Sequence, residues 1–153
     1  MKDKKKVTVK QKGWWWYLPP FCISGRNRYS STIGHTIYLT PKRWKSHMSG
    51  NPSRGTNALI EHEVTHIIQQ ERYGSFKWMF LYLFSKKKRI LFESEAYAYQ
   101  VISYGPKGKT ETFNYVQKRA KSMASWRYFM SITQEDAYIL IMDNIAKIRK
   151  INV

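Results

Sequence analysis

Five residues near the middle of the chain have the types and the spacing of two metal ligands and a general base. They read His62-Glu63-Val64-Thr65-His66, an H-E-x-x-H sequence. On an α-helix, residues i and i+4 lie one above the other on the same face, so the two imidazoles would converge on one point. Glu63 would lie about 100° further round the helix, where it could address a water on a metal but could not easily be a third ligand. The spacing predicts one metal ion held by His62 and His66, with Glu63 as the general base.

The residues around the motif predict the helix that it requires. One inward stripe follows the helical i, i+3, i+4, i+7, i+8, i+11 spacing: Leu59, His62, Glu63, His66, Ile67 and Gln70. Burying such polar groups without partners costs about 2 to 7 kcal/mol for each neutral group, and a bound cation removes this objection. We expect Thr56 or Asn57 to cap the helix and Gly74 to end it. The alternatives are a degenerate former site or two surface histidines without a ligand role.

A second helix is predicted from Ile90 to Tyr104, where Gly105 and Pro106 end it. Its inward stripe is Glu93, Ala96, Tyr97, Gln100, Val101 and Tyr104. Glu93 can therefore point to the interior while Glu95 faces elsewhere, although an ordinary solvent-facing carboxylate is the alternative for Glu93. Hydrolytic zinc takes three protein ligands and keeps one position for water. We expect Zn²⁺ to be held by His62, His66 and Glu93.

Such a site predicts the hydrolysis of a peptide or protein substrate. A zinc-bound water has its pKa lowered toward about 7, and the metal polarises the substrate carbonyl. Glu63 would accept the proton of the water and pass it to the leaving amine. The product is a hydrolysed amide.

The segments HEVTHIIQQERYG and LFESEAYAYQ resemble a known group of enzymes, the glutamate-type zincins, which include thermolysin and the membrane-linked CAAX-type proteases. More narrowly, they resemble small HExxH metallopeptidases of bacteria and their phages, which carry H-E-x-x-H-x-x-Q and a downstream F-E-x-E-A. The resemblance covers residues 32 to 104. It implies a zincin-like fold, a ligand role for Glu93 and a catalytic base role for Glu63.

One departure from the group concerns Tyr97, which stands where the larger group has aspartate, four residues after the ligand. The carboxylate that usually lies behind a ligand histidine is therefore missing or comes from elsewhere. This departure keeps Glu95 as an alternative metal ligand. Tyr97, Tyr104 and His35 are candidates to support the ligands or the transition state.

The rest of the chain predicts an α+β fold that is mainly helical, with a small N-terminal sheet. We expect residues 1–153 to form one domain, and the resemblance implies that this domain is zincin-like. Residues 1–12 read as a basic flexible arm in which Val7 and Val9 could add an edge strand, and Trp14 to Ile23 as an aromatic cover for the core. Thr36 to Thr40 predicts a strand on which an extended substrate could pair. His47 is expected in a loop.

Further helices are predicted after the strand and the motif. Ser75 to Phe84 is apolar all round and reads as a short buried helix, separated by the basic connector 86–89 from the helix that carries Glu93. Two helices follow, one from Thr110 to Met130 and one that begins at Ser131 or Thr133. Both look structural, and their outer faces are basic.

Composition adds a second functional hypothesis. The chain has 27 Lys and Arg against 10 Asp and Glu, a net charge of +17, which favours nucleic acid or another anionic partner. The alternative to a peptidase is a non-catalytic virion or nucleic-acid-associated structural protein on a zincin scaffold. A single cysteine, Cys22, excludes an intrachain disulfide. Neither a transmembrane helix nor a signal peptide is predicted, so we expect a soluble protein, cytoplasmic or virion-associated.

Overall fold

The computed structural model describes residues 7–13, 30–125 and 132–151, and within them the chain forms three strands and six helices. The strands are β1 (Thr8–Gln11), β2 (Ser31–Ile33) and β3 (Thr36–Leu39). The helices are α1 (Pro41–Met48), α2 (Arg54–Tyr73), α3 (Ser75–Phe84), α4 (Lys86–Tyr104), α5 (Gly108–Met123) and α6 (Gln134–Ile151). The predicted α+β class, mainly helical with a small N-terminal sheet, is confirmed. The predicted aromatic cover of residues 14–23 lies outside the described residues.

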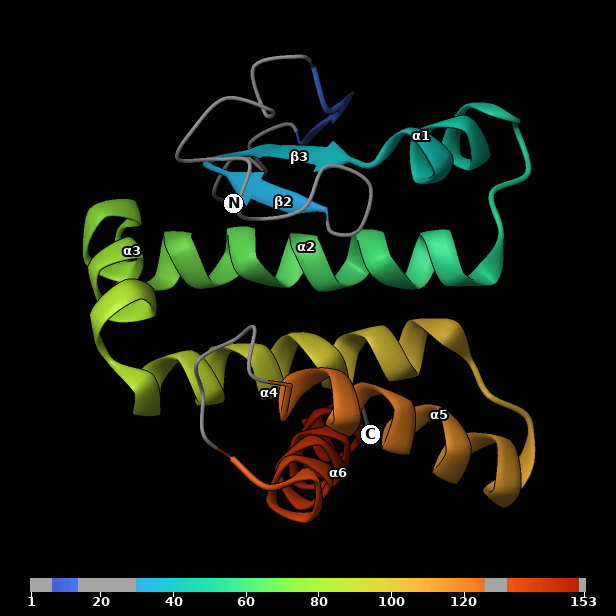
Figure 1. The fold of residues 1–153 in the computed structure, drawn as a ribbon, viewed down its shortest axis with the longest axis vertical. Coiled ribbons are helices and arrows are strands. Elements are labelled where there is room, and N and C mark those ends of the chain that lie inside the picture. The colour runs from blue at the N-terminus through green and yellow to red at the C-terminus, as the bar shows by residue number, and fades with distance from the viewer. Residues whose placement is uncertain (1–6, 14–29, 126–131, 152–153) are drawn as a thin grey trace.

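The helices and the sheet are stacked in layers about α2 and α4 (Figure 1). These two long helices lie side by side and antiparallel, and α3 joins them at one end of the molecule. The sheet lies on the far side of α2, whereas α5 and α6 lie beyond α4. The H-E-x-x-H motif on α2 and Glu93 on α4 thus both lie at the interface between these two helices.

Two apolar clusters hold these layers together on either side of that interface. The smaller one joins the sheet to α2 through Ile37, Leu39 and Ile67. The larger one joins α4, α5 and α6, and its buried members are Tyr97, Ala98, Val101, Val116, Ala120, Met123, Ala137, Ile141 and Ile145. Between the clusters, α2 and α4 bury polar side chains instead, so their interface needs internal partners for those groups.

The ends of α2 and α4 follow local capping rules. The side chain of Ser53 accepts a hydrogen bond from the backbone N–H of Thr56 at 3.2 Å, so α2 begins at Arg54. The prediction that Thr56 or Asn57 is the cap is therefore wrong, and both residues lie in the first turn. Gly74 and Gly105 have positive φ angles of 82° and 60° and end α2 and α4 as predicted.

The segment between these two helices differs from its prediction in two ways. Only Trp78 of α3 is buried, so the expectation of a buried helix is wrong. The predicted basic connector 86–89 forms the first turn of α4, because the Ser85 side chain accepts a hydrogen bond from the N–H of Lys88. No loop separates the two helices beyond Ser85 itself.

The sheet has β3 in its centre. The strand order is β1-β3-β2, with β1 parallel and β2 antiparallel to β3. The predicted strand at 36–40 is present as β3, but both of its sides are paired, so the prediction that a substrate could pair with it is wrong. Among the described residues, the unpaired edges belong to β1 and β2.

The predicted arm of residues 1–12 overlaps β1. The expected edge strand containing Val9 is present, and Lys12, which follows it, is only 4% exposed. The solvated character expected of the arm therefore does not extend to Lys12. Residues 1–6 lie outside the described residues.

The remaining helices match their predictions in part. His47, expected in a loop, lies in α1, which has Pro41 in its first turn. α5 ends at Met123, and residues 126–130 of the predicted 110–130 helix lie outside the described residues. Thr133 precedes α6 and its hydroxyl accepts from the N–H of Asp136 at 3.0 Å. Within the described residues, none of the helices combines the length and the apolar character that a membrane crossing requires.

Candidate metal centre

Three potential metal ligands meet at the boundary between α2 and α4. The Nε2 atom of His62 lies 3.5 Å from Oε2 of Glu93, and Nε2 of His66 lies 3.5 Å from Oε1 of the same carboxylate. One ligand atom from each of the three residues lies within 4.8 Å of the other two. The histidines are each 6% exposed and Glu93 is 1% exposed. The helical spacing of the motif and the stripe on α4 thus bring together the residues that the sequence singles out.

Each histidine lies about as far from one oxygen of Glu93 as two ligand atoms of a small tetrahedral ion lie from each other. Zinc bonds of about 2.0–2.1 Å place neighbouring ligand atoms of a tetrahedron roughly 3.4 Å apart, close to both 3.5 Å separations. Oε2 of Glu93 is buried and has no hydrogen-bond partner among the described residues. A buried carboxylate whose two oxygens each face an imidazole, and whose Oε2 has no hydrogen bond, is an arrangement that a shared cation would complete.

The charges within this group are strongly coupled. Burial raises the pKa of the Glu93 carboxyl, but the contacts with His62 and His66 outweigh burial and hold that pKa well below its usual range. Burial lowers the pKa of His66, but Glu93, Glu63 and Gln69 oppose it and raise the pKa of His66 to about 9. Without a metal, a proton on His66 therefore supplies a positive charge beside Glu93.

Gln69 fixes the orientation of His66. Its amide nitrogen donates to the carbonyl oxygen of Phe92 and to Oε2 of Glu95, both at 2.9 Å. Because both partners only accept, the amide oxygen must face the other way, where it lies 3.0 Å from Nδ1 of His66. Nδ1 is thus the donor, and Nε2 faces Glu93. Gln69 does for His66 what a carboxylate behind a ligand histidine does elsewhere.

Glu95 belongs to this supporting layer. Besides its bond from Gln69, it forms an ion pair with Arg72 at 3.2 Å. It is not one of the three grouped ligands. Glu93 is thus the carboxylate that lies next to the imidazoles. Glu95, the alternative ligand of the sequence analysis, accepts a hydrogen bond from Gln69 instead.

Two aromatic residues of α3 complete the surroundings, and sequence reasoning missed both. The hydroxyl of Tyr82 donates to Oε1 of Glu93 at 2.5 Å, and the indole N–H of Trp78 lies 3.4 Å from the amide oxygen of Gln69. Burial, followed by the negative charge of Glu93, raises the pKa of Tyr82 well above its usual value, so the hydroxyl stays a donor. Trp78 and Tyr82 are four residues apart and therefore lie on one face of α3, and this spacing was the only sequence feature that could have indicated them.

Glu63 lies beside the ligands and forms a hydrogen bond with a residue of the sheet. It is 5% exposed, and its Oε2 accepts a hydrogen bond of 2.5 Å from the hydroxyl of Thr32 on β2. Lys12 lies near enough to interact with it electrostatically: burial lowers the pKa of Lys12, and the Glu63 carboxylate opposes this shift. Neither Thr32 nor Lys12 was predicted, because Thr32 lies in β2 and Lys12 directly follows β1, both far from the motif in sequence.

The three candidate supporting residues have different positions. The ring of Tyr97 packs edge-on against the imidazole of His62, with 4.6 Å between ring centroids. Tyr104 is eleven residues from Glu93 on the same helix, about 16 Å along its axis, and its ring stacks on Tyr115 instead. His35 pairs with Glu71 at 2.9 Å near the surface. Tyr97 alone therefore adjoins the ligands, and the roles suggested for Tyr104 and His35 are not supported.

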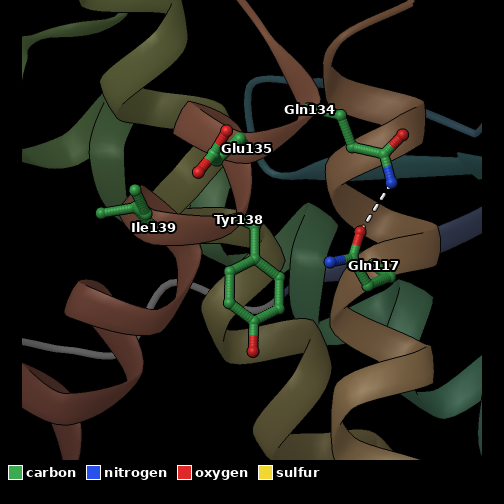
Figure 2. Close-up of a pocket in the computed structure, with 5 residues that line it drawn as sticks. All are labelled: Gln117, Gln134, Glu135, Tyr138 and Ile139. Atoms are coloured by element: carbon green, nitrogen blue, oxygen red, sulfur yellow. Dashed lines mark hydrogen bonds between the residues drawn. The ribbon is translucent and has the colours of Figure 1, made fainter.

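A surface hollow of about 550 Å³ lies elsewhere, between α5 and α6 (Figure 2). It is lined by Gln117, Gln134, Glu135, Tyr138 and Ile139, with a hydrogen bond of 2.6 Å between the two glutamine side chains. None of the candidate ligands contributes to it. The hollow is thus separate from the candidate metal centre.

Comparison of the chain with protein-family models, with curated proteins and with solved structures finds no match.

Proposed function

We propose that this protein is a zinc-dependent peptidase with a zincin-like fold. The observation that carries the proposal is the convergence of His62, His66 and Glu93 from two helices, with Glu63 next to them. A purely structural interface would favour apolar residues at these positions, since buried ionisable groups reduce stability unless they are paired.

The donor set favours zinc. Two imidazole nitrogens and one carboxylate oxygen are the ligands of many hydrolytic zinc sites, which leave the fourth position open. Thiolates, which would favour cluster or copper chemistry, are absent from the group, and an all-oxygen set suited to magnesium or calcium is absent too.

The residues of the chain divide the reaction between them. Zinc, when bound, would polarise the substrate carbonyl and make the attacking water more acidic. Glu63 would take one proton from that water as its oxygen bonds to the carbonyl carbon. It would then return the proton to the amine as the carbon–nitrogen bond breaks. The hydroxyl of Thr32 engages Oε2 of Glu63, which leaves the second carboxylate oxygen for the proton.

An extended peptide is the substrate that the surroundings suit. β2 carries Thr32 and pairs on one side with β3, and its other side is unpaired among the described residues. An extended chain can add to such an edge through main-chain hydrogen bonds. We therefore place the substrate along β2, next to Glu63, in place of the position along β3 that the sequence suggested.

Metal analysis tests the proposal directly. The purified protein should take up one zinc per chain, and His62→Ala and His66→Ala should each lose it. Glu63→Gln should keep the zinc and lose peptide hydrolysis. His47→Ala, which changes a histidine of α1 outside the ligand group, is the matched control. A wild-type chain that takes up no zinc when zinc is offered would refute the proposal.

A second candidate function rests on the basic outer faces of α5 and α6. The exposed cations of these two helices are Lys109, Lys118, Lys121, Lys147, Arg149 and Lys150. Nucleic-acid binding through them would weaken steeply as salt rises and would survive chelation of zinc. Hydrolysis should show the opposite pattern, so measuring both activities with chelator and with added salt separates the two functions.

A further inference from the structure

The outward face of α3 is apolar and exposed. Its five residues follow the i, i+3, i+4, i+7, i+8 spacing of one helix face: Phe76 (87% exposed), Met79 (49%), Phe80 (62%), Leu83 (56%) and Phe84 (73%). The rings of Phe80 and Phe84 lie against each other, with 4.9 Å between centroids. Single exposed apolar residues are ordinary on protein surfaces, but a contiguous group of this kind marks an interaction site. We call these five residues the α3 patch.

The other side of α3 is tied to the metal centre, which fixes the direction of the α3 patch. Trp78 and Tyr82 point inward to Gln69 and Glu93. Figure 1 shows α3 at one end of the molecule, where it crosses the ends of α2 and α4. The patch therefore faces away from the body of the protein, and the helix can lie flat on a surface while α2 and α4 extend away from it.

The chain around the patch is cationic. From Arg72 to Phe92 there are six basic residues and no acidic one; the basic residues are Arg72, Lys77, Lys86, Lys87, Lys88 and Arg89. Lys77, Lys86 and Lys87 are exposed. Lys88 and Arg89 turn back to the protein, Lys88 over the ring of Tyr73 and Arg89 to the carbonyl oxygen of Tyr82. Three lysines thus remain beside the exposed aromatic rings.

We propose that the α3 patch and these three lysines dock the protein on an anionic membrane surface. A short helix with aromatic and aliphatic residues on one face and lysines beside them is suited to the boundary between headgroups and acyl chains. Anionic headgroups attract the lysines, and the rings enter the apolar layer. A second copy would bring like charges together, and a nucleic acid offers no apolar phase for five such side chains.

Vesicle co-sedimentation of the full chain tests this assignment. Wild-type protein should bind vesicles of mixed phosphatidylcholine and phosphatidylglycerol and bind pure phosphatidylcholine vesicles weakly. The double variant Phe80→Ser/Phe84→Ser should weaken binding by more than about tenfold. The control Phe113→Ser/Ile139→Ser removes two apolar side chains of similar exposure, 51% and 50%, from α5 and α6, and should bind like wild type.

A second pair of variants separates the position of charge from its amount. Lys77→Gln/Lys86→Gln/Lys87→Gln should weaken binding by more than about tenfold, since each lysine at the surface contributes to attraction. Lys118→Gln/Lys121→Gln/Lys150→Gln removes the same charge elsewhere and should have a much smaller effect. Equal losses in the two triple variants would mean that net charge alone holds the protein to the vesicles, and would overturn the proposal.

Two other outcomes would also overturn it. Light scattering that shows a wild-type dimer, converted to a monomer by Phe80→Ser/Phe84→Ser, would assign the patch to a second copy of this chain. A large fall in the melting temperature of that variant without vesicles would mean that the patch is packed in the folded protein. Membrane docking does not depend on the proposed hydrolysis: Glu63→Gln should bind vesicles like wild type, whether or not zinc is found.

Discussion

Nδ1 of His66 lies 3.0 Å from the side-chain oxygen of Gln69, one helical turn further along α2. The amide of Gln69 is held by acceptors on α4, so it forces Nε2 of His66 toward Glu93. The consequence is a histidine whose tautomer and direction are set before any metal arrives.

Gln69→Leu should therefore weaken zinc binding by about 10- to 100-fold, because His66 loses the acceptor that orients it. The dissociation constant can be measured by competition with a chromophoric chelator. Gln70→Leu is the matched control: Gln70 is also buried on α2, at 6% exposed, and its amide nitrogen has no hydrogen-bond partner among the described residues. Equal losses in both variants would attribute the effect to helix packing and not to the orientation of His66.

Thr32→Val should leave zinc content unchanged and lower kcat by about tenfold or more, because Glu63 loses the donor that holds Oε2 and proton transfer depends on its position. The change should fall on kcat more than on KM. Thr36→Val in the neighbouring strand β3 should have little effect. A variant that loses zinc, or changes KM alone, would contradict the assigned role of Thr32.

Zinc uptake should release a proton from His66. With a pKa of about 9, His66 is protonated at pH 7.5 in the metal-free protein, and zinc binds only the neutral imidazole. Zinc affinity should therefore rise with pH until about pH 9. Calorimetric titration at pH 7.5 in buffers of different ionisation enthalpy measures this release. Release of close to no proton would show that His66 is already neutral.

The stability of the metal-free protein should fall between pH 6.5 and 9. The folded-state pKa of His66 is raised from 6.5 to about 9, so its contribution is fully present below pH 6.5 and is lost as pH rises through 9. The size of the contribution is on the order of 3 kcal/mol. Urea unfolding at the two pH values measures it, and His66→Gln should remove most of the difference. A pH dependence that is unchanged in His66→Gln would assign it to other groups.

Local patterns in the sequence account for much of the site. The spacing of His62 and His66 and the stripe that contains Glu93 depend on helical periodicity, which extends over only a few residues. The cap of α2 was misplaced by a few residues because Ser53, Thr56 and Asn57 are all good capping residues, and only the geometry selects Ser53.

Contacts between distant segments could not be read in this way. Thr32 reaches Glu63 only because the sheet docks on α2. Tyr82 reaches Glu93 because α3 turns back at Gly74. The exposed face of α3 could not be predicted for another reason. When every face of a helix is apolar, the periodicity of the sequence does not indicate which face is buried. The sequence predicts that Lys12 belongs to a charged arm, although its position after β1 buries it.

The antiparallel arrangement of α2 and α4 gives a bound ion a mechanical role. His66 and Glu93 are 27 residues apart in the sequence, so an ion shared by them would close a loop that contains all of α3. Cross-linking a loop of this length restricts the unfolded chain and stabilises the folded one by roughly 3 to 4 kcal/mol in the case of a disulfide. The single cysteine of this chain cannot form an internal disulfide, so the metal would be the cross-link that stabilises this loop. Chelation should then loosen the hairpin of α2, α3 and α4 and expose it to proteolytic cleavage.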